Sequence, residues 1–141
     1  MSKARITHIQ LKVESMHRTA DFYKSIFGFK EPERRRTRDD HSTVHLTDGV
    51  IDLACTQYDN DNSTEAQAHG PGFKIGHFGI EVEDVVATMA RLKEYGCTII
   101  SPPGQVPVKF YFPGSGGMAE IAPIGAFKRP RTGKFKNIDK S

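Results

Sequence analysis

The feature that most constrains this sequence is an internal repeat. Residues 7–15 read Thr-His-Ile-Gln-Leu-Lys-Val-Glu-Ser, and residues 76–84 read Gly-His-Phe-Gly-Ile-Glu-Val-Glu-Asp. In each copy a histidine opens an alternating run, and an amphipathic stretch then continues to a glycine, Gly28 or Gly96. A repeat of this kind within 141 residues predicts two half-size modules packed together in one domain.

Each copy predicts a strand followed by a helix. In the first copy, Ile9, Leu11 and Val13 alternate with His8 and the other polar residues, so the histidine belongs to the polar face of a half-buried strand. The helices are expected to start and stop at capping residues, which are Ser15 and Gly28 in the first copy and Asp84 and Gly96 in the second.

Three shorter strands are expected after each helix, which makes each module a βαβββ unit. In the first module they lie near residues 29–35, 42–47 and 50–57, and in the second near residues 98–101, 108–112 and 118–123. The pair Asp48-Gly49 is a strong hairpin signal between two of them. We therefore expect a first module at about 5–57, a polar linker or mobile loop at about 58–73, and a second module at about 74–125.

Charge and composition narrow the class of protein. The net charge of +3 comes from the C-terminal tail, because six basic residues after position 125 face one aspartate and the first 125 residues carry −2. We expect this tail, residues 126–141, to be mobile or to lie against a partner chain.

A second basic cluster at residues 33–38 is interpreted as a solvated hairpin edge, with a clamp for an anionic substrate as the alternative. The sequence predicts neither nucleic-acid nor membrane binding, and the absence of a signal-peptide pattern predicts a cytoplasmic protein.

Superposing the two modules gives a candidate site. His8 corresponds to His77, and the strand around Asp52 corresponds to the strand around Glu120. Neighbouring apolar residues fall on one face of each final strand, so both carboxylates project from the opposite face. If the modules pair about a pseudo-twofold axis, two imidazoles and two carboxylates converge. Such a mixed set suits Fe(II), Mn(II), Ni(II), Co(II) or Zn(II), whereas single surface residues of these types are usually not ligands.

The sequence resembles the vicinal oxygen chelate superfamily, which includes glyoxalase I, methylmalonyl-CoA epimerase, fosfomycin-resistance and bleomycin-binding proteins, and extradiol dioxygenases. The resemblance rests on Thr7-His8-Ile9 before the stretch at 22–29, on residues 76–84, and on Glu120 in the last strand. It covers residues 5 to 125, nearly all of a single domain at residues 1–125.

This resemblance implies an α+β fold in which two tandem βαβββ modules form a cupped mixed β-sheet with flanking helices around a divalent metal. It places His8, Asp52, His77 and Glu120 at the ligand positions of the family. Asp52 is a departure, because glyoxalase I and the epimerase have longer Glu or Gln side chains there. The site is therefore either a closed four-ligand one or an open set of two histidines and one carboxylate. The modules can pair within one chain or swap between two, and we expect a homodimer.

The reaction implied by the family is less specific than its fold. Members use the metal to hold vicinal oxygens of a substrate and to stabilise an enolate, an oxyanion or a bound oxygen species. For a lyase, isomerase or epimerase, Glu120 or Asp52 would remove a proton beside a metal-bound carbonyl. We therefore expect a divalent-metal-dependent lyase or isomerase of the glyoxalase I or epimerase type, acting on a small oxygenated metabolite through a metal-bound enolate.

Two alternatives remain open. An Fe(II) extradiol dioxygenase would use Tyr111, which resembles that family's tyrosine in the last hairpin, but the histidine expected upstream of it is absent and only His45 could replace it. A non-catalytic binding protein of the bleomycin-resistance type would use the same fold without the ligands, so His8, His77 and Glu120 argue against it.

Overall fold

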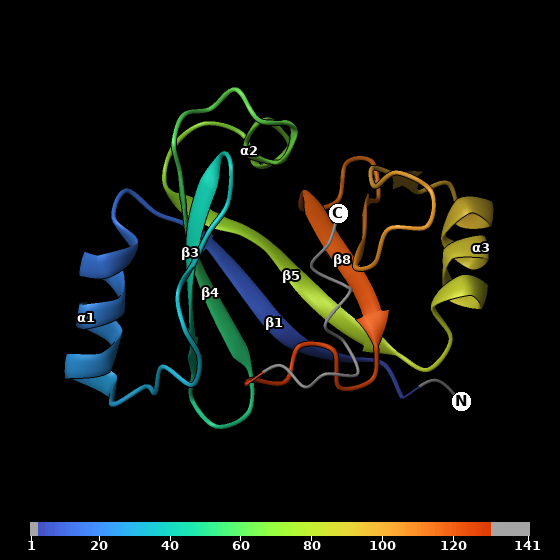
Figure 1. Cartoon of the computed structure of the whole chain (residues 1–141). Coiled ribbons are helices and arrows are strands. Elements are labelled where there is room, and N and C mark those ends of the chain that lie inside the picture. Colours follow the sequence, from blue (N-terminus) through green and yellow to red (C-terminus); the bar gives the residue numbers. More distant parts are fainter. Residues whose placement is uncertain (1–2, 131–141) are drawn as a thin grey trace.

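A single sheet runs through the whole molecule. The computed structural model describes residues 3–130, whose eight strands pair in the order β2-β3-β4-β1-β5-β8-β7-β6. The strands are β1 (Arg5–Lys12), β2 (Arg36–Thr37), β3 (His41–Thr47), β4 (Asp52–Tyr58), β5 (Lys74–Val82), β6 (Thr98–Ile99), β7 (Val108–Tyr111) and β8 (Met118–Pro123). With the helices outside it, this mixed sheet gives the α+β fold that the resemblance implied (Figure 1).

The two long helices begin and end where their capping residues predict. In α1 (Met16–Phe27) the side chain of Ser15 accepts a hydrogen bond from the third residue of the helix, and Gly28 ends it at a φ of 71°. In α3 (Val85–Tyr95) Asp84 and Gly96 have the same two roles. A left-handed φ is easily adopted by glycine, so each helix stops at its glycine.

The modules join within one chain through β1 and β5. These two strands pair antiparallel at the centre of the sheet, while β1 pairs parallel with β4 and β5 pairs parallel with β8. Figure 1 shows the resulting pseudo-symmetry, with β1 and β5 crossing the middle and α1 and α3 at opposite ends. The first strand and the last strand of each module are therefore neighbours, and this brings their polar faces together.

The strand expected near residues 29–35 is largely missing. In its place the structure has one isolated bridge between Lys30 and Thr47, and the edge strand β2 starts only at Arg36. Pro32 has no N–H group for a ladder, and the side chain of Arg35 is hydrogen-bonded to Glu31 four residues earlier. The sheet edge is consequently shorter than expected.

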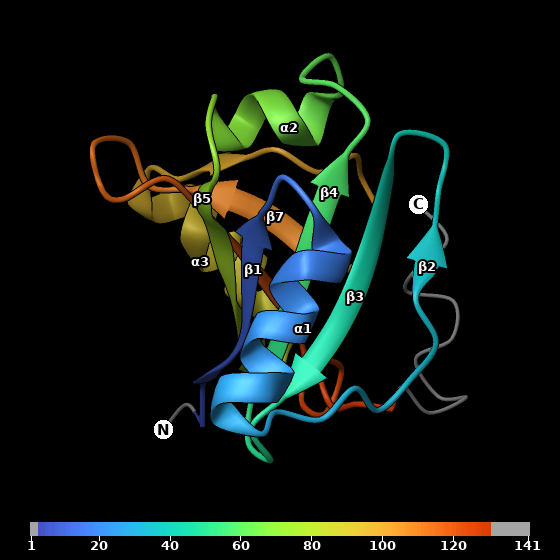
Figure 2. The ribbon, with the colours of Figure 1, turned by 90° about the vertical axis from the view of Figure 1, so that its left-hand side faces the viewer.

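The segment expected to be a linker contains a helix that sequence periodicity did not reveal. Helix α2 (Thr64–His69) is capped by Ser63, whose hydroxyl accepts from the N–H of Ala66. It covers one end of the sheet, beside β4 and β5 (Figure 2). Six residues contain fewer than two turns, so the period of 3.6 has no room to appear.

The sheet has an apolar convex face and a polar concave face. Apolar side chains of β3 and β4 pack with Met16 and Ala20 of α1, and those of β7 and β8 pack with α3. The opposite face of β1 carries buried His8, Gln10 and Lys12. Burial of the apolar face thus orients the strands. The polar side chains of both modules consequently line the same concave face. Among residues 3–130, none of the helices has the length and hydrophobicity that a membrane-spanning helix requires.

Candidate metal centre

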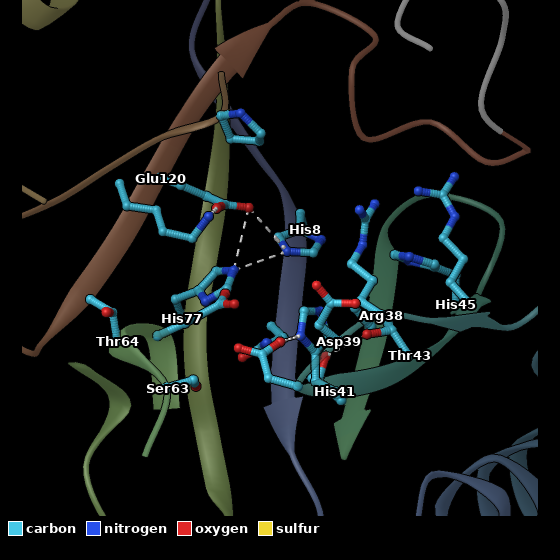
Figure 3. A pocket seen from close by; sticks show the side chains of 18 of the residues that line it. His8, Arg38, Asp39, His41, Thr43, His45, Ser63, Thr64, His77 and Glu120 are labelled. Atoms are coloured by element: carbon cyan, nitrogen blue, oxygen red, sulfur yellow. Dashed lines mark hydrogen bonds and ion pairs between the residues drawn. The ribbon is translucent and has the colours of Figure 1, made fainter. Parts of the chain in front are cut away.

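Three side chains meet on the concave face in a nearly equilateral triangle. The Nε2 atoms of His8 on β1 and His77 on β5 are 3.2 Å apart, and each lies 3.3 Å from Oε1 of Glu120 on β8. All three residues are buried, and Figure 3 shows them pointing toward one another from adjacent strands. The repeat has therefore brought together two equivalent histidines and one of the two equivalent carboxylates.

The triangle has the dimensions of one face of a metal coordination sphere. Metal–nitrogen and metal–oxygen bonds of about 2.0–2.2 Å give ligand–ligand separations of about 3.0–3.4 Å in tetrahedral and octahedral sites. A carboxylate oxygen has no proton to donate when ionised, so three lone pairs facing one another repel unless a cation lies among them. His8, His77 and Glu120 thus form a group whose dimensions fit a metal ion.

A buried carboxylate fixes the orientation of His8. Asp52 Oδ2 accepts a hydrogen bond of 2.6 Å from Nδ1 of His8, so the lone pair of this imidazole is on Nε2. The other oxygen, Oδ1, lies 2.8 Å from Nδ1 of His45. Burial alone would raise the pKa of Asp52, but His45 and His8 lower it well below the usual value, so the group is an anion. Such outer-sphere carboxylates orient histidine ligands and raise their basicity.

Another histidine, His69, fixes the orientation of His77. Nε2 of His69, at the end of α2, lies 2.9 Å from Nδ1 of His77. Burial, together with the nearby His77, lowers the pKa of His69 to about 3, so its ring is neutral and can accept this hydrogen bond. The phenol of Tyr58 lies 3.3 Å from the other nitrogen of His69 and receives a hydrogen bond from Gln10. The two histidines of the triangle are therefore supported differently, one by a carboxylate and one by a neutral imidazole.

A lysine lies on the far side of Glu120. Lys109 on β7 is the register partner of Glu120, and its Nζ is 3.4 Å from Oε2. Burial opposes the charge of each group, but the mutual attraction raises the pKa of Lys109, and His77 and Lys109 lower that of Glu120. The Glu120 carboxylate thus has one oxygen toward the two histidines and the other toward an ammonium group.

The segment after β8 packs into the site. Phe127 stacks on the ring of His8 with centroids 4.5 Å apart, and its backbone N–H donates to a carboxylate oxygen of Glu81. The ring can approach because residue 79 is glycine, where a Cβ would lie 2.7 Å from it. The tail was expected to be mobile or partner-bound from residue 126, but Ala126 and Phe127 are buried against the domain. Residues 131–141 lie outside the described part of the chain.

Arg129 connects this segment to the first module. Its side chain is 3% exposed, and Nε lies 3.5 Å from Asp52 Oδ1 while Nη1 lies 3.1 Å from Glu33 Oε1. Neither contact has the alignment of a hydrogen bond, so the interaction is Coulombic. Arg129 therefore compensates the buried Asp52 and the partly buried Glu33 at once.

A cavity of about 980 Å³ opens in front of the triangle. Besides His8, His77 and Glu120, polar side chains from both modules line it, including Arg36, Arg38, His41, His45, Glu65 and Lys109. The basic cluster at residues 33–38, interpreted as a solvated edge, therefore contributes Arg36 and Arg38 to the cavity wall. Figure 3 shows Arg38, Asp39 and His41 around it on the side of the first module.

Two predicted site residues are placed apart from the triangle. Asp52 lies behind His8, and neither Asp52 nor Tyr111 is among the residues that line the cavity. Tyr111 is 38% exposed near the end of β7. The roles of both as ligand or catalytic group stay predictions.

Sequence reasoning missed the residues that support the triangle. His69 lies in an unrecognised helix, Lys109 in a strand with no repeat-equivalent charge, and Phe127 and Arg129 in a segment with little pattern. One signal was available for Phe127, because glycine at position 79 interrupts a strand and such a glycine often marks a close approach. For the others no sequence signal was available.

The sheet topology defines a fold built from two repeated modules, and the triangle on its concave face is a candidate metal site. The sequence model of the Glyoxalase/Bleomycin resistance protein/Dioxygenase superfamily matches residues 5–114. The chain belongs to this superfamily.

Individual relatives agree with this membership. Lactoylglutathione lyase from Neisseria meningitidis (serogroup A) is 22% identical over 100 residues, which cover 71% of this chain and 72% of the relative. The probable chloroplastic lactoylglutathione lyase of Arabidopsis thaliana is 31% identical over 118 residues, 74% of this chain, but the match spans 30% of that longer protein.

Solved structures share the fold at lower identity. A methylmalonyl-CoA epimerase in complex with methylmalonyl-CoA and NH4+ has a TM-score of 0.70 at 19% identity, over 90% of this chain and 99% of that one. The epimerase from Mycobacterium tuberculosis has a TM-score of 0.65 at 16% identity, over 84% and 88% of the two chains. At these identities the likeness shows the arrangement of the modules.

Proposed function

We propose that this protein is a divalent-metal-dependent lyase or isomerase that acts on a small oxygenated metabolite by removing a proton next to a carbonyl group. The observation that carries the proposal is the triangle of His8, His77 and Glu120, whose edges of 3.2 and 3.3 Å suit one cation. The names of the curated relatives, which are lyases, support the reaction class.

The residues of the chain have distinct tasks in this proposal. A bound Fe, Mn, Ni, Co or Zn ion would polarise a carbonyl oxygen and so acidify the adjacent C–H bond. His8 and His77 present their Nε2 lone pairs, because their Nδ1 atoms are engaged by Asp52 and His69. The ring of Phe127 covers one face of His8 and keeps water from it.

Glu65 is the carboxylate that we assign to proton removal, in place of Asp52. One of its oxygens lies within 4.8 Å of ring nitrogens of His69 and His77, and its side chain lines the cavity. Asp52 is fully buried behind His8, with both oxygens engaged. Glu120 lines the cavity too, and its Oε2 is the second candidate, although the partner Lys109 lowers the basicity of this oxygen.

Metal analysis followed by two assays tests the proposal. Protein purified without oxygen should contain one equivalent of a divalent metal, and the reloaded protein should be assayed with the hemithioacetal of glutathione and with methylmalonyl-CoA. Small 2-hydroxy and 2-keto acids should then be screened by NMR for deuterium exchange at carbon. E65Q should retain the metal and lose exchange. Absence of stoichiometric metal would favour the alternative of a non-catalytic binding protein.

Ring-cleaving dioxygenation is a second candidate because of His45. This imidazole lines the cavity, and burial lowers its pKa, so it is a neutral group of the kind a second-sphere base requires. Its Nδ1 faces Asp52, which leaves Nε2 as the nitrogen for a substrate. Oxygen uptake with catechols by iron-loaded protein, lost in H45F, would support this candidate over the lyase.

We further propose a cytoplasmic homodimer. Large apolar side chains are exposed along α1 and at the start of β5, among them Phe22, Ile26, Phe73 and Ile75. A cluster of this kind is typical of a protein interface. Sedimentation that finds only monomer at high concentration would reject the dimer.

A further inference from the structure

Lys109 is largely shielded from solvent in an unusual place. Its neighbours along β7, Val108 and Phe110, belong to the apolar cluster under α3, so strand alternation turns the lysine to the concave face. There it lines the cavity with a side chain that is only 18% exposed. Lysine is rarely buried unless its charge is paired, so the ammonium group needs an anionic partner.

The ion-pair partner of Lys109 among the described residues also takes part in the triangle. Glu120 is the one ion-pair partner of Lys109 in the described chain, at 3.4 Å, and its other oxygen belongs to the triangle with His8 and His77. When a divalent cation occupies the triangle, one carboxylate lies between that cation and the ammonium group. The two histidines add no charge, because as ligands they are neutral.

Counting charges at the triangle and its ion-paired neighbours shows a deficit of anions. A divalent cation and Lys109 supply three positive charges against one negative charge on Glu120. On the other side of His8, Asp52 and Glu33 are paired with Arg129, and Glu33 is paired also with Arg36, so these four groups balance one another. Glu65, on α2, is the remaining carboxylate near the triangle and leaves the site with an excess of one positive charge. Unpaired buried charge is costly, so a ligand that brings its own negative charge completes this site.

A purely structural role does not explain the choice of lysine. Holding Oε2 of Glu120 requires one hydrogen-bond donor, and a neutral amide or hydroxyl group would supply it. An ammonium group at that position repels the cation on the other side of the carboxylate and weakens its binding. The lysine is explained if a further hydrogen-bond acceptor enters the cavity, because the ammonium group has three N–H donors to share.

We propose that Lys109 binds an anionic oxygen of the substrate, and that the substrate is a small carboxylate with a hydroxyl or carbonyl oxygen on the adjacent carbon. The inference rests on the proposed function, because it takes the triangle to be the metal site. It adds the chemical class of the substrate and assigns Lys109 as the residue that selects for charge.

Oxalate is the probe for this site. Cobalt-loaded parent protein, K109M and K109R should be titrated with oxalate by calorimetry and by the visible spectrum of the metal, with the exposed Lys128→Gln variant as control. A charge-assisted hydrogen bond contributes about 1.5–3 kcal/mol, so K109M should bind oxalate about 10- to 100-fold more weakly. K109R and K128Q should stay within about threefold of the parent, and K109M should bind neutral hydroxyacetone as the parent does.

The outcomes distinguish a failure of the Lys109 assignment from a failure of the proposed function. If K109M binds oxalate as tightly as the parent, or loses both oxalate and cobalt because Glu120 is no longer held, the assignment of Lys109 is wrong. If K109M retains cobalt and loses oxalate, the assignment stands. A parent protein without stoichiometric cobalt would instead refute the proposed function, and the oxalate comparison on that metal-free protein would still decide whether Lys109 binds the anion.

Discussion

Asp52 Oδ2 lies 2.6 Å from Nδ1 of His8 and therefore on the opposite side of the imidazole from Glu120. The two carboxylates are equivalent in the repeat but not in their contacts. Asp52 is the direct register partner of His8, whereas Glu120 is paired with Gly79, two residues beyond His77. A short side chain beside its histidine reaches Nδ1, and a longer one farther along the strand reaches both Nε2 atoms.

Removing the carboxylate of the triangle should abolish metal binding. In E120A one of the three ligands is lost, and Lys109 is left as an unpaired cation next to the site. We expect metal content after gel filtration to fall from about one equivalent to near zero. The exposed Glu83→Ala variant should keep its metal. An E120A protein that retains metal and activity would show that the triangle is not the site.

Asp52→Asn should weaken metal binding without changing the coordination number. The amide can donate to Nδ1 of His8 and so favour the wrong tautomer, and loss of an outer-sphere carboxylate typically costs 10- to 100-fold in affinity. Chelator competition with Co(II) measures the affinity, and X-ray absorption counts the ligands. One oxygen fewer in the first shell of D52N would mean that Asp52 is a fourth ligand.

Arg129→Gln should destabilise the domain more than any exposed substitution nearby. Its removal leaves Asp52 and Glu33 without their buried counter-charge, and breaking a buried pair in this way costs about 3–5 kcal/mol. The adjacent Lys128→Gln is the matched control, since that side chain is exposed. Urea unfolding of the two variants provides the comparison. Equal midpoints would contradict a structural role for the 126–129 segment.

Gly79→Ala tests the packing of Phe127 on His8. A Cβ at this position would lie 2.7 Å from the phenyl ring and 3.0 Å from Cβ of His8, so the ring must move. Overpacking of this kind costs about 1–3 kcal/mol. In a double-mutant cycle with Phe127→Leu, whose smaller side chain leaves room, the two losses should be less than additive. Strict additivity would indicate that residues 79 and 127 do not contact each other.

Acid should remove the contribution of Glu31 to stability. Hydrogen bonds from Arg35, and more weakly from Lys24, outweigh burial and lower the pKa of Glu31 to about 2. A carboxyl group with a depressed folded-state pKa stabilises above its unfolded value of about 4.3 and loses that effect as the pH falls toward 2. The difference in denaturation midpoint between the parent and E31Q should therefore shrink from pH 6 to pH 3. Exposed Glu14→Gln should show no such trend.

Local signals in the sequence were sufficient for the repeated modules. Helix α1 begins after Ser15 and ends at Gly28, and α3 begins after Asp84 and ends at Gly96, because caps and left-handed glycines act on their immediate neighbours. The alternation in β1 and β5 likewise determined which face each histidine occupies. Helix α2 could not be predicted in this way, because it is too short for a periodic pattern.

The sequence by itself thus determined two βαβββ modules and the face of the sheet on which His8, His77 and Glu120 lie. Only the tertiary structure decided that Asp52 supports His8 and that Lys109 and Arg129 enter the same cup. Periodicity fixes the direction of a side chain relative to its own strand, which is a local property. Distances between atoms of different strands depend on register, side-chain length and the path of distant segments, and those are set only when the chain packs.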